Sequence, residues 1–238
     1  MDQLIPDTNS FPADPPSDLD DALAITDHDW GAFSALTRMK NHWNRTGWED
    51  PNRRVLYWLL TFAGQPDLLD LVQRCQQPLE PLGLDLIAAD GLHVTMVRVG
   101  DRHLVSPSRA QDLVRAVDDM GLPAFTVHAH PLTGSRGAVR FSLSPWTPLV
   151  RLHTALTLVG SSHGVPGGSD TSSFRPHLGV AYNPCGRDAR PVIDTVAPLR
   201  RLPPVALRVG SVDLVELRRE GRSYRWETLA KVALAGSA

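Results

Sequence analysis

The chain has 238 residues, 42% of them hydrophobic, and a formal net charge of −2 at neutral pH. This composition is typical of a globular protein with a packed core, and the small negative charge argues against a protein that coats nucleic acid by charge alone. No apolar run approaches the length of a membrane helix, and the N-terminus lacks the pattern of a secretory signal, so we expect a cytoplasmic protein that does not bind membranes. Its two cysteines, Cys75 and Cys185, support neither a disulfide framework nor a zinc site.

The N-terminal quarter differs in composition from the rest. Residues 1–21 contain several prolines and aspartates but no lysine or arginine, which predicts a disordered acidic tail. Residues 22–53 are predicted to be a helical extension, in which Trp30, Phe33, Leu36 and Met39 form an apolar stripe. A helix that binds a partner protein is the alternative interpretation of this extension.

The main domain is expected at 54–232, followed by a flexible C-terminus at 233–238. Its first half begins with an apolar strand at 55–62 and a helix that Pro66 opens. A strand within 91–100 carries His93, and the next helix has Ser106 as its cap and ends at Gly121. A strand at 124–130 closes this half.

The second half repeats this order. A strand at 138–143 leads to a helix from Pro148 to Gly160, then to a glycine- and serine-rich loop. The strand at 174–182 carries His177, and a helix at 190–199, a long strand at 205–217 and a final strand at 223–232 follow. An internal duplication is the simplest explanation, and it predicts a bilobal α+β fold of duplicated strand-helix-strand-helix-strand units around a central cleft. If the halves pack about a pseudo-two-fold axis, the two histidines meet across that cleft.

The two histidine strands resemble the paired His-x-Thr/Ser motifs of the 2H phosphoesterase superfamily, which includes bacterial 2′-5′ RNA ligase-like proteins and cyclic nucleotide phosphodiesterases. The first copy is His93-Val94-Thr95, with Gly100-Asp101 after it. The second is Phe174-Arg175-Pro176-His177, with Ala181-Tyr182 after it, and here Gly179 stands where the family has a hydroxyl. The resemblance covers about residues 54–232.

The resemblance implies an enzyme that needs no metal or other cofactor and acts on an RNA end or a small nucleotide. It would open a 2′,3′-cyclic phosphate, or form a 2′-5′ linkage in reverse, with His93 and His177 as general acid and base. Which histidine has which role stays open. Thr95 would bind a phosphate oxygen, and Gly179 is the candidate phosphate-binding position of the second motif, where the hydroxyl is missing.

Other candidate site residues rest on weaker patterns. Arg175 shares the strand face of His177 and is a candidate phosphate contact, whereas strand alternation predicts that Arg98 lies outside the cleft. Tyr57 and Tyr182 are candidates for stacking on a base, with a role in the core as the alternative. His163, in the loop after the fourth expected helix, is a candidate lid residue or a solvated one. No metal site is expected, because His128 and His130 lack a third ligand at suitable spacing.

Two other functions stay open at this point. One is an RNA- or nucleotide-binding module without efficient turnover, which the missing hydroxyl at Gly179 favours. The other is an interaction protein that acts through its N-terminal extension. We expect a monomer in either case.

Overall fold

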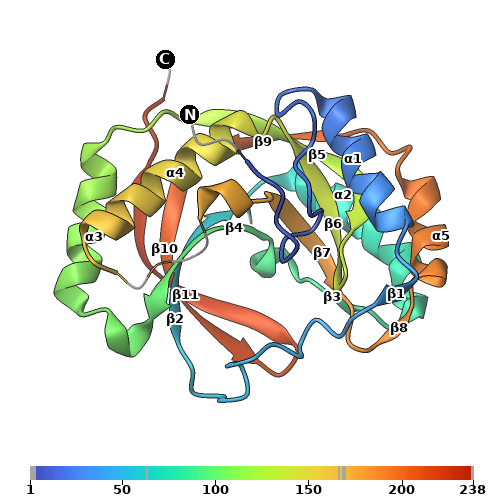
Figure 1. The fold of residues 1–238 in the computed structure, drawn as a ribbon, viewed down its shortest axis with the longest axis horizontal. Coiled ribbons are helices and arrows are strands. Elements are labelled where there is room, and N and C mark those ends of the chain that lie inside the picture. Colours follow the sequence, from blue (N-terminus) through green and yellow to red (C-terminus); the bar gives the residue numbers. More distant parts are fainter. Residues whose placement is uncertain (1–3, 63, 166, 168–169, 237–238) are drawn as a thin grey trace.

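Two antiparallel sheets, each with its own helices, lie side by side in the computed structural model, which describes residues 4–62, 64–165, 167 and 170–236 (Figure 1). The smaller sheet has the strand order β11-β10-β2-β4 and the larger one the order β3-β7-β6-β5-β9. The strands of the smaller sheet are β2 (Val55–Thr61), β4 (His93–Asp101), β10 (Ser211–Glu220) and β11 (Ser223–Ala233). Those of the larger sheet are β3 (Asp85–Leu86), β5 (Phe125–Gly134), β6 (Ala138–Ser144), β7 (His177–Tyr182) and β9 (Val205–Val209).

The helices divide between the two sheets. The smaller sheet is covered by α3 (Pro107–Asp119), which contacts β11, and α4 (Thr147–Ser162), which contacts β4. The larger sheet packs against α1 (Ala22–Ser34), α2 (Pro66–Gln76) and α5 (Arg190–Leu199). Short elements complete the fold: the 3-10 helices η1 (Gln77–Leu82), η2 (Ala89–Gly91), η3 (Arg102–Leu104) and η4 (Thr171–Ser173), and a two-stranded ribbon of β1 (Arg38–Met39) and β8 (Arg187–Asp188). None of the described helices is long and apolar enough to cross a membrane.

The two halves of the sequence exchange strands, which the sequence pattern did not reveal. The long strand predicted at 205–217 is broken after Val209: β9 pairs with β5 in the larger sheet, whereas β10 pairs with β2 in the smaller one. In the same way β5 follows α3 in sequence but belongs to the larger sheet. The bilobal α+β architecture is confirmed, but each lobe is built from strands of both halves.

The helices cross between the lobes as well. Helix α2 directly follows β2 of the smaller sheet, yet it contacts β5, β7 and β9 of the larger one. Helix α4 follows β6 of the larger sheet and contacts β4 of the smaller one. The lobes are therefore tied together at several points along the chain, and β4 and β7 come into contact where the sheets meet.

The N-terminal segment is packed on the body, so the disorder expected for residues 1–21 is not observed for residues 4–21. Leu4 is buried, Pro12 and Pro16 are buried, and Phe11 packs against the core. The Ile5 N–H donates to the carbonyl of Ser172 at 3.0 Å. Composition alone misses this order because the contacts come from residues far along the chain.

The predicted extension at 22–53 is part of the same fold. Helix α1 starts earlier than the apolar stripe suggested: the Asp21 side chain accepts hydrogen bonds from the N–H groups of Leu23 and Ala24, which fixes the first turn. The helix packs on β5 and β6 through Ile25 and Phe33, and it ends at Ser34, so Met39 of the predicted stripe lies in β1 instead.

The C-terminus is also held, at least to residue 236. Leu234 is buried, and the Ala235 N–H donates to the carbonyl of Leu122 at 2.7 Å. The expected flexibility at 233–238 is therefore not observed for residues 233–236, and residues 237–238 lie outside the described part of the chain.

Candidate active site

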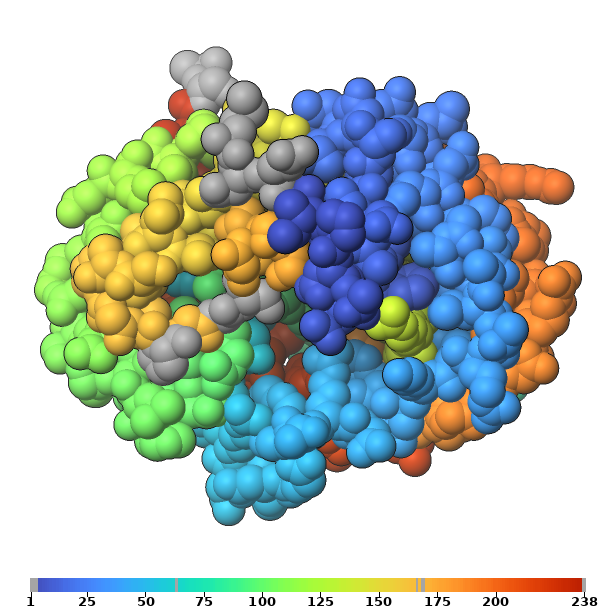
Figure 2. All heavy atoms as spheres, in the orientation of Figure 1, coloured from blue at the N-terminus to red at the C-terminus, as the bar shows by residue number. Residues whose placement is uncertain are grey.

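The two motif histidines line one cleft between the lobes. His93 is the first residue of β4 and His177 the first residue of β7, and both contribute to a hollow of about 290 Å³ together with Thr95, Gly179 and Tyr182. A second hollow of about 640 Å³ adjoins it and shares Thr95 and His177. In Figure 2 the N-terminal segment, in dark blue, lies across this face of the molecule with a hollow beside it.

The two imidazoles are held in the same way. Nδ1 of His93 lies 2.8 Å from the carbonyl oxygen of Gly91, and Nδ1 of His177 lies 2.9 Å from the carbonyl oxygen of Arg175. In both cases the partner is two residues earlier in the sequence. Because a carbonyl oxygen can only accept, Nδ1 carries the proton in each ring, and Nε2 is left as the atom that can take up or give a proton. The two motif histidines thus share a tautomer as well as a position at the start of a strand.

The surroundings of the cleft favour neutral imidazoles. Burial lowers the pKa of His93, and burial followed by the charge of Arg140 lowers the pKa of His177, against the hydrogen bond to the Arg175 carbonyl, which raises it. The charge of His93, which lines the same hollow, also lowers the pKa of His177. The ring of His177 is exposed to the cleft, so water reaches it there.

A hydroxyl stands beside each histidine on the neighbouring strand. Thr61 of β2 pairs with His93 and donates to Asp213 at 2.7 Å; Ser142 of β6 pairs with His177 and donates to Asp29 at 2.6 Å. Both carboxylates are buried, with exposed fractions of 2% and 1%. Opposite residues of an antiparallel strand pair have their side chains on the same face of the sheet. Each hydroxyl, with the carboxylate that it donates to, therefore lies next to one histidine.

The cleft is strongly cationic, a property the sequence analysis missed. The described lining residues of the two hollows include six cationic side chains and no carboxylate. These cations are Lys40, Arg45, Arg98, Arg136, Arg140 and Arg175. In a protein whose net charge is −2, this concentration of positive charge favours an anionic ligand. Only two of them, Arg98 and Arg140, are in strands; the others lie in loops that the fold brings to the cleft, which the sequence does not show.

The two motifs differ at their hydroxyl position. Thr95 is exposed in the cleft on the His93 side. On the other side Gly179 leaves a gap that is partly filled, because a Cβ there would stand 2.9 Å from Cδ1 of Ile87.

The guanidinium of Arg175 faces the N-terminal segment. Its nitrogens donate to three carbonyl groups of the N-terminal segment and to two carbonyl groups just before Arg175 in the sequence. These belong to Ile5, Pro12 and Ala13, and to Ser172 and Phe174. An arginine has five N–H donors, and these five bonds account for all of them. Arg175 therefore anchors the segment that forms one wall of the cleft, and the expected phosphate contact does not agree with these bonds.

Arg98 lines the larger hollow, contrary to the expectation that it lies outside. Thr95 pairs with Leu59 but Val97 pairs with Trp58, so Met96 is an extra residue in β4. A bulge of this kind reverses the alternation of side chains beyond it, which turns Arg98 to the cleft face. There it donates to Asp101 at 2.9 Å.

The aromatic candidates are in or near the cleft, and His163 is not. Tyr57 lines the larger hollow, and Tyr182 lines the smaller one with one face stacked on His42 at a centroid distance of 3.9 Å. His163 caps the end of α4, where its Nδ1 lies 2.9 Å from the carbonyl of Val159. It does not appear among the described residues that line the cleft.

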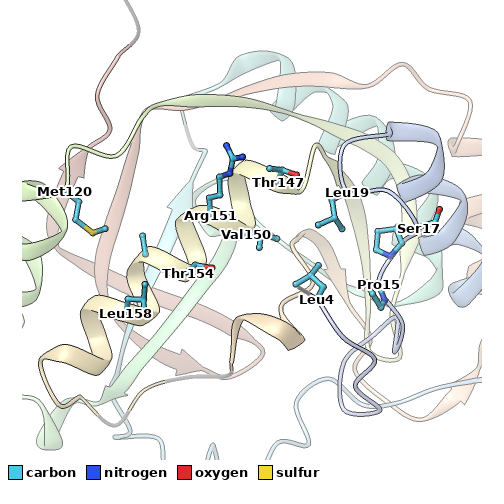
Figure 3. A pocket seen from close by; sticks show the side chains of 12 residues that line it. Leu4, Pro15, Ser17, Leu19, Met120, Thr147, Val150, Arg151, Thr154 and Leu158 are labelled. Atoms are coloured by element: carbon cyan, nitrogen blue, oxygen red, sulfur yellow. The ribbon is translucent and has the colours of Figure 1, made fainter. Parts of the chain in front are cut away.

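A hollow larger than either of the two in the cleft lies elsewhere. It has about 780 Å³ and runs between α4 and the N-terminal segment, with Leu4, Leu19, Val150 and Leu158 along it (Figure 3). Arg151 is the one ionisable residue among its described lining residues, so the hollow has no acid-base pair and we do not assign the chemistry to it. Within the described residues, no three His, Cys, Asp or Glu side chains gather closely enough to hold a metal ion.

Comparison with known proteins supports the same architecture. The fold is similar to a crystal structure of a phosphoesterase (TM-score 0.59, 17% identity, 76% of this chain and 98% of that one). It is also similar to Escherichia coli LigT complexed with ATP (TM-score 0.56, 18% identity, 76% and 98%) and to TT0787 of Thermus thermophilus (0.59, 16%, 77% and 100%). A sequence search among curated proteins finds no match. The model of the 2′-5′ RNA ligase superfamily matches residues 65–221, which include both histidine strands. The chain therefore belongs to the 2′-5′ RNA ligase superfamily, the 2H phosphoesterases.

Proposed function

We propose that the protein is a cyclic phosphodiesterase that opens a 2′,3′-cyclic phosphate on an RNA end or small nucleotide, without a metal or other cofactor. The observation that carries this proposal is the pair of imidazoles on one cationic cleft, each with Nδ1 bonded to a carbonyl and with no partner for Nε2 among the described residues. E. coli LigT has been crystallised with ATP and with 3′-AMP, which supports a nucleotide as ligand.

In this reaction a water oxygen forms a bond to phosphorus while one bond from phosphorus to a ribose oxygen breaks. The attacking water gives its proton to a neutral imidazole, and the departing ribose oxygen receives a proton from the other imidazole, which must be protonated. Thr95 donates to a phosphate oxygen and stabilises the charge that grows there.

The electrostatics of the cleft support His177 as the base and His93 as the acid. Arg140, which is close enough to lower the pKa of His177, disfavours a second positive charge on that ring. His93 has no such neighbour among the effects on its pKa, where burial is the main cause of the shift. A bound phosphate anion would then favour the protonated form of His93.

The experiment is incubation of the purified protein with a 2′,3′-cyclic nucleotide in the presence of a chelator. We expect His93→Ala and His177→Ala each to lower turnover by roughly 10²- to 10⁴-fold. His163→Ala is the matched control, because this histidine lies outside the cleft, and it should leave turnover unchanged. Turnover that survives both cleft substitutions contradicts the proposal.

A second candidate is a nucleotide-binding module without turnover, favoured by Gly179 at the hydroxyl position. Binding of the cyclic nucleotide by the wild-type protein without any product would support it. Function through the N-terminal extension alone has less support, because residues 4–14 are packed beside the cleft.

A further inference from the structure

Arg140, in the middle of β6, is a buried cation whose hydrogen-bonding capacity is not filled. Its exposed fraction is 3%. Nη2 donates to the carbonyl of Phe11 at 2.9 Å, but Nε has no partner in the described structure. Burial lowers the pKa of Arg140, opposed by the carboxylate of Asp29, which already accepts from Ser142. A buried guanidinium with an unused donor is costly unless an anion completes its surroundings.

The register of the larger sheet places Arg140 beside the gap in the second motif. Arg140 pairs with Gly179, and Ser142 pairs with His177, so all four residues present their side-chain positions on one face. Arg140 lines the same hollow as Thr95 and His177. The second motif therefore lacks its hydroxyl, but Arg140 of the neighbouring strand lies directly opposite the position where that hydroxyl would be.

We propose that Arg140 is a catalytic residue that donates to the phosphate oxygens of the substrate and replaces the hydroxyl missing at Gly179. The assignment rests on the proposed function for its substrate, a phosphate ester of a nucleotide. A guanidinium offers a charge-assisted donor fork that fits phosphate, and in a buried setting such bonds are stronger than those of a hydroxyl. The two lobes then hold the phosphate by different chemistry: Thr95 on one side and Arg140 on the other.

The first test measures binding of inorganic phosphate by isothermal titration calorimetry and needs no turnover. We expect Arg140→Gln to weaken the affinity by roughly tenfold to a hundredfold, the loss typical of a hydrogen bond to a charged group. Arg190→Gln is the control, since it removes the same charge from α5, where the side chain is 74% exposed and pairs with Asp194. No phosphate binding by the wild type, or equal binding by wild type and Arg140→Gln, overturns the proposal.

The second test separates phosphate contact from a structural role, because Arg140 also holds the N-terminal segment through Phe11. Arg140→Gln is combined with Gly179→Ser, and with Ile87→Val to clear the 2.9 Å contact at that position. We expect the restored hydroxyl to recover part of the phosphate affinity. A hydroxyl at residue 179 would not recover an affinity that was lost only because the structure had changed. No recovery of phosphate affinity in the combined variant would therefore overturn the assignment.

The third measurement is kcat/KM on the cyclic nucleotide, which should fall in Arg140→Gln and stay unchanged in Arg190→Gln. If the wild type shows no turnover, the proposed function fails while the calorimetric result still decides the role of Arg140. An unchanged kcat/KM in Arg140→Gln, with an active wild type, overturns the catalytic assignment.

Discussion

Two buried histidines, His42 and His153, contribute to the dependence of the protein's stability on pH. His42 is 9% exposed and His153 is 3% exposed. Burial lowers the pKa of His42 to about 3, with the charge of Arg45 as the next cause, and burial lowers the pKa of His153 to about 4. Both rings are therefore neutral in the folded protein at pH 5, whereas in the unfolded chain they become protonated below a pKa of about 6.5.

The sign of the effect follows from this difference. Above pH 6.5 both states hold neutral rings, and the histidines do not distinguish them. As the pH falls from 6.5 toward 4, the unfolded chain binds protons that the folded protein does not, so the free energy of unfolding decreases. Each ring contributes about 1.4 kcal/mol per pH unit, which amounts to about 4 kcal/mol for the two rings between pH 7.5 and pH 5.0.

The assay is urea denaturation at several pH values between 7.5 and 5.0, a range in which few carboxylates titrate. His153→Gln isolates one ring, because an amide can keep the hydrogen bond that Nδ1 of His153 makes with Thr171 at 2.9 Å. The variant should lose about 2 kcal/mol less than the wild type over the same range. A free energy of unfolding that falls equally in the two proteins would refute the reasoning, and so would one that is flat in the wild type.

Three further predictions concern the site and the packing around it. Thr95→Val should lower kcat/KM on a cyclic nucleotide by roughly tenfold to a hundredfold through the lost phosphate contact, and wild-type kinetics would contradict the role of this hydroxyl. Arg175→Met should lower the free energy of unfolding by roughly 2–4 kcal/mol and expose residues 4–14 to limited proteolysis, and Arg175→Lys should not restore the wild-type pattern because it lacks the five-donor fork. Gly134→Ala, in β5, should lower the melting temperature, because its Cβ would stand 2.6 Å from Cζ of Phe33 in α1. Gly31→Ala, in α1 itself, should raise the melting temperature, because there is open space around Gly31 and alanine favours a helix. Equal melting temperatures for these two variants would contradict the packing described for α1.

Local elements could be predicted where the sequence contains their stop and start signals. Helix α5 runs from Arg190 to Leu199 as predicted, and α2 begins at Pro66, because proline in the first turn and an apolar stripe are properties of the segment itself. The pairing of His93 and His177 on one cleft was also accessible as a hypothesis, since a duplicated pattern implies equivalent positions.

Features that depend on distant partners could not be predicted. In the strand predicted at 205–217 the apolar alternation changes phase after Val209, from Val205, Leu207 and Val209 to Val212 and Leu214. That change marks a break in the strand, but it does not show that β9 and β10 belong to different sheets. The position of Arg98 depends on a bulge at Met96, which is defined only by the pairing with β2. The order of the N-terminal segment depends on Arg175, more than 150 positions away in the sequence.

The two lobes differ mainly in the residues that surround His177. Both lobes share a histidine with its Nδ1 bonded to a carbonyl two residues earlier, and both have a hydroxyl paired with a buried carboxylate beside it. Only the second lobe combines Gly179, the buried Arg140 and a wall formed by the N-terminal segment. A symmetric pair of imidazoles has no preferred direction of proton transfer, whereas the proposed hydrolysis needs one base and one acid. In the proposed reaction, the asymmetry around His177 is what gives the two histidines different roles.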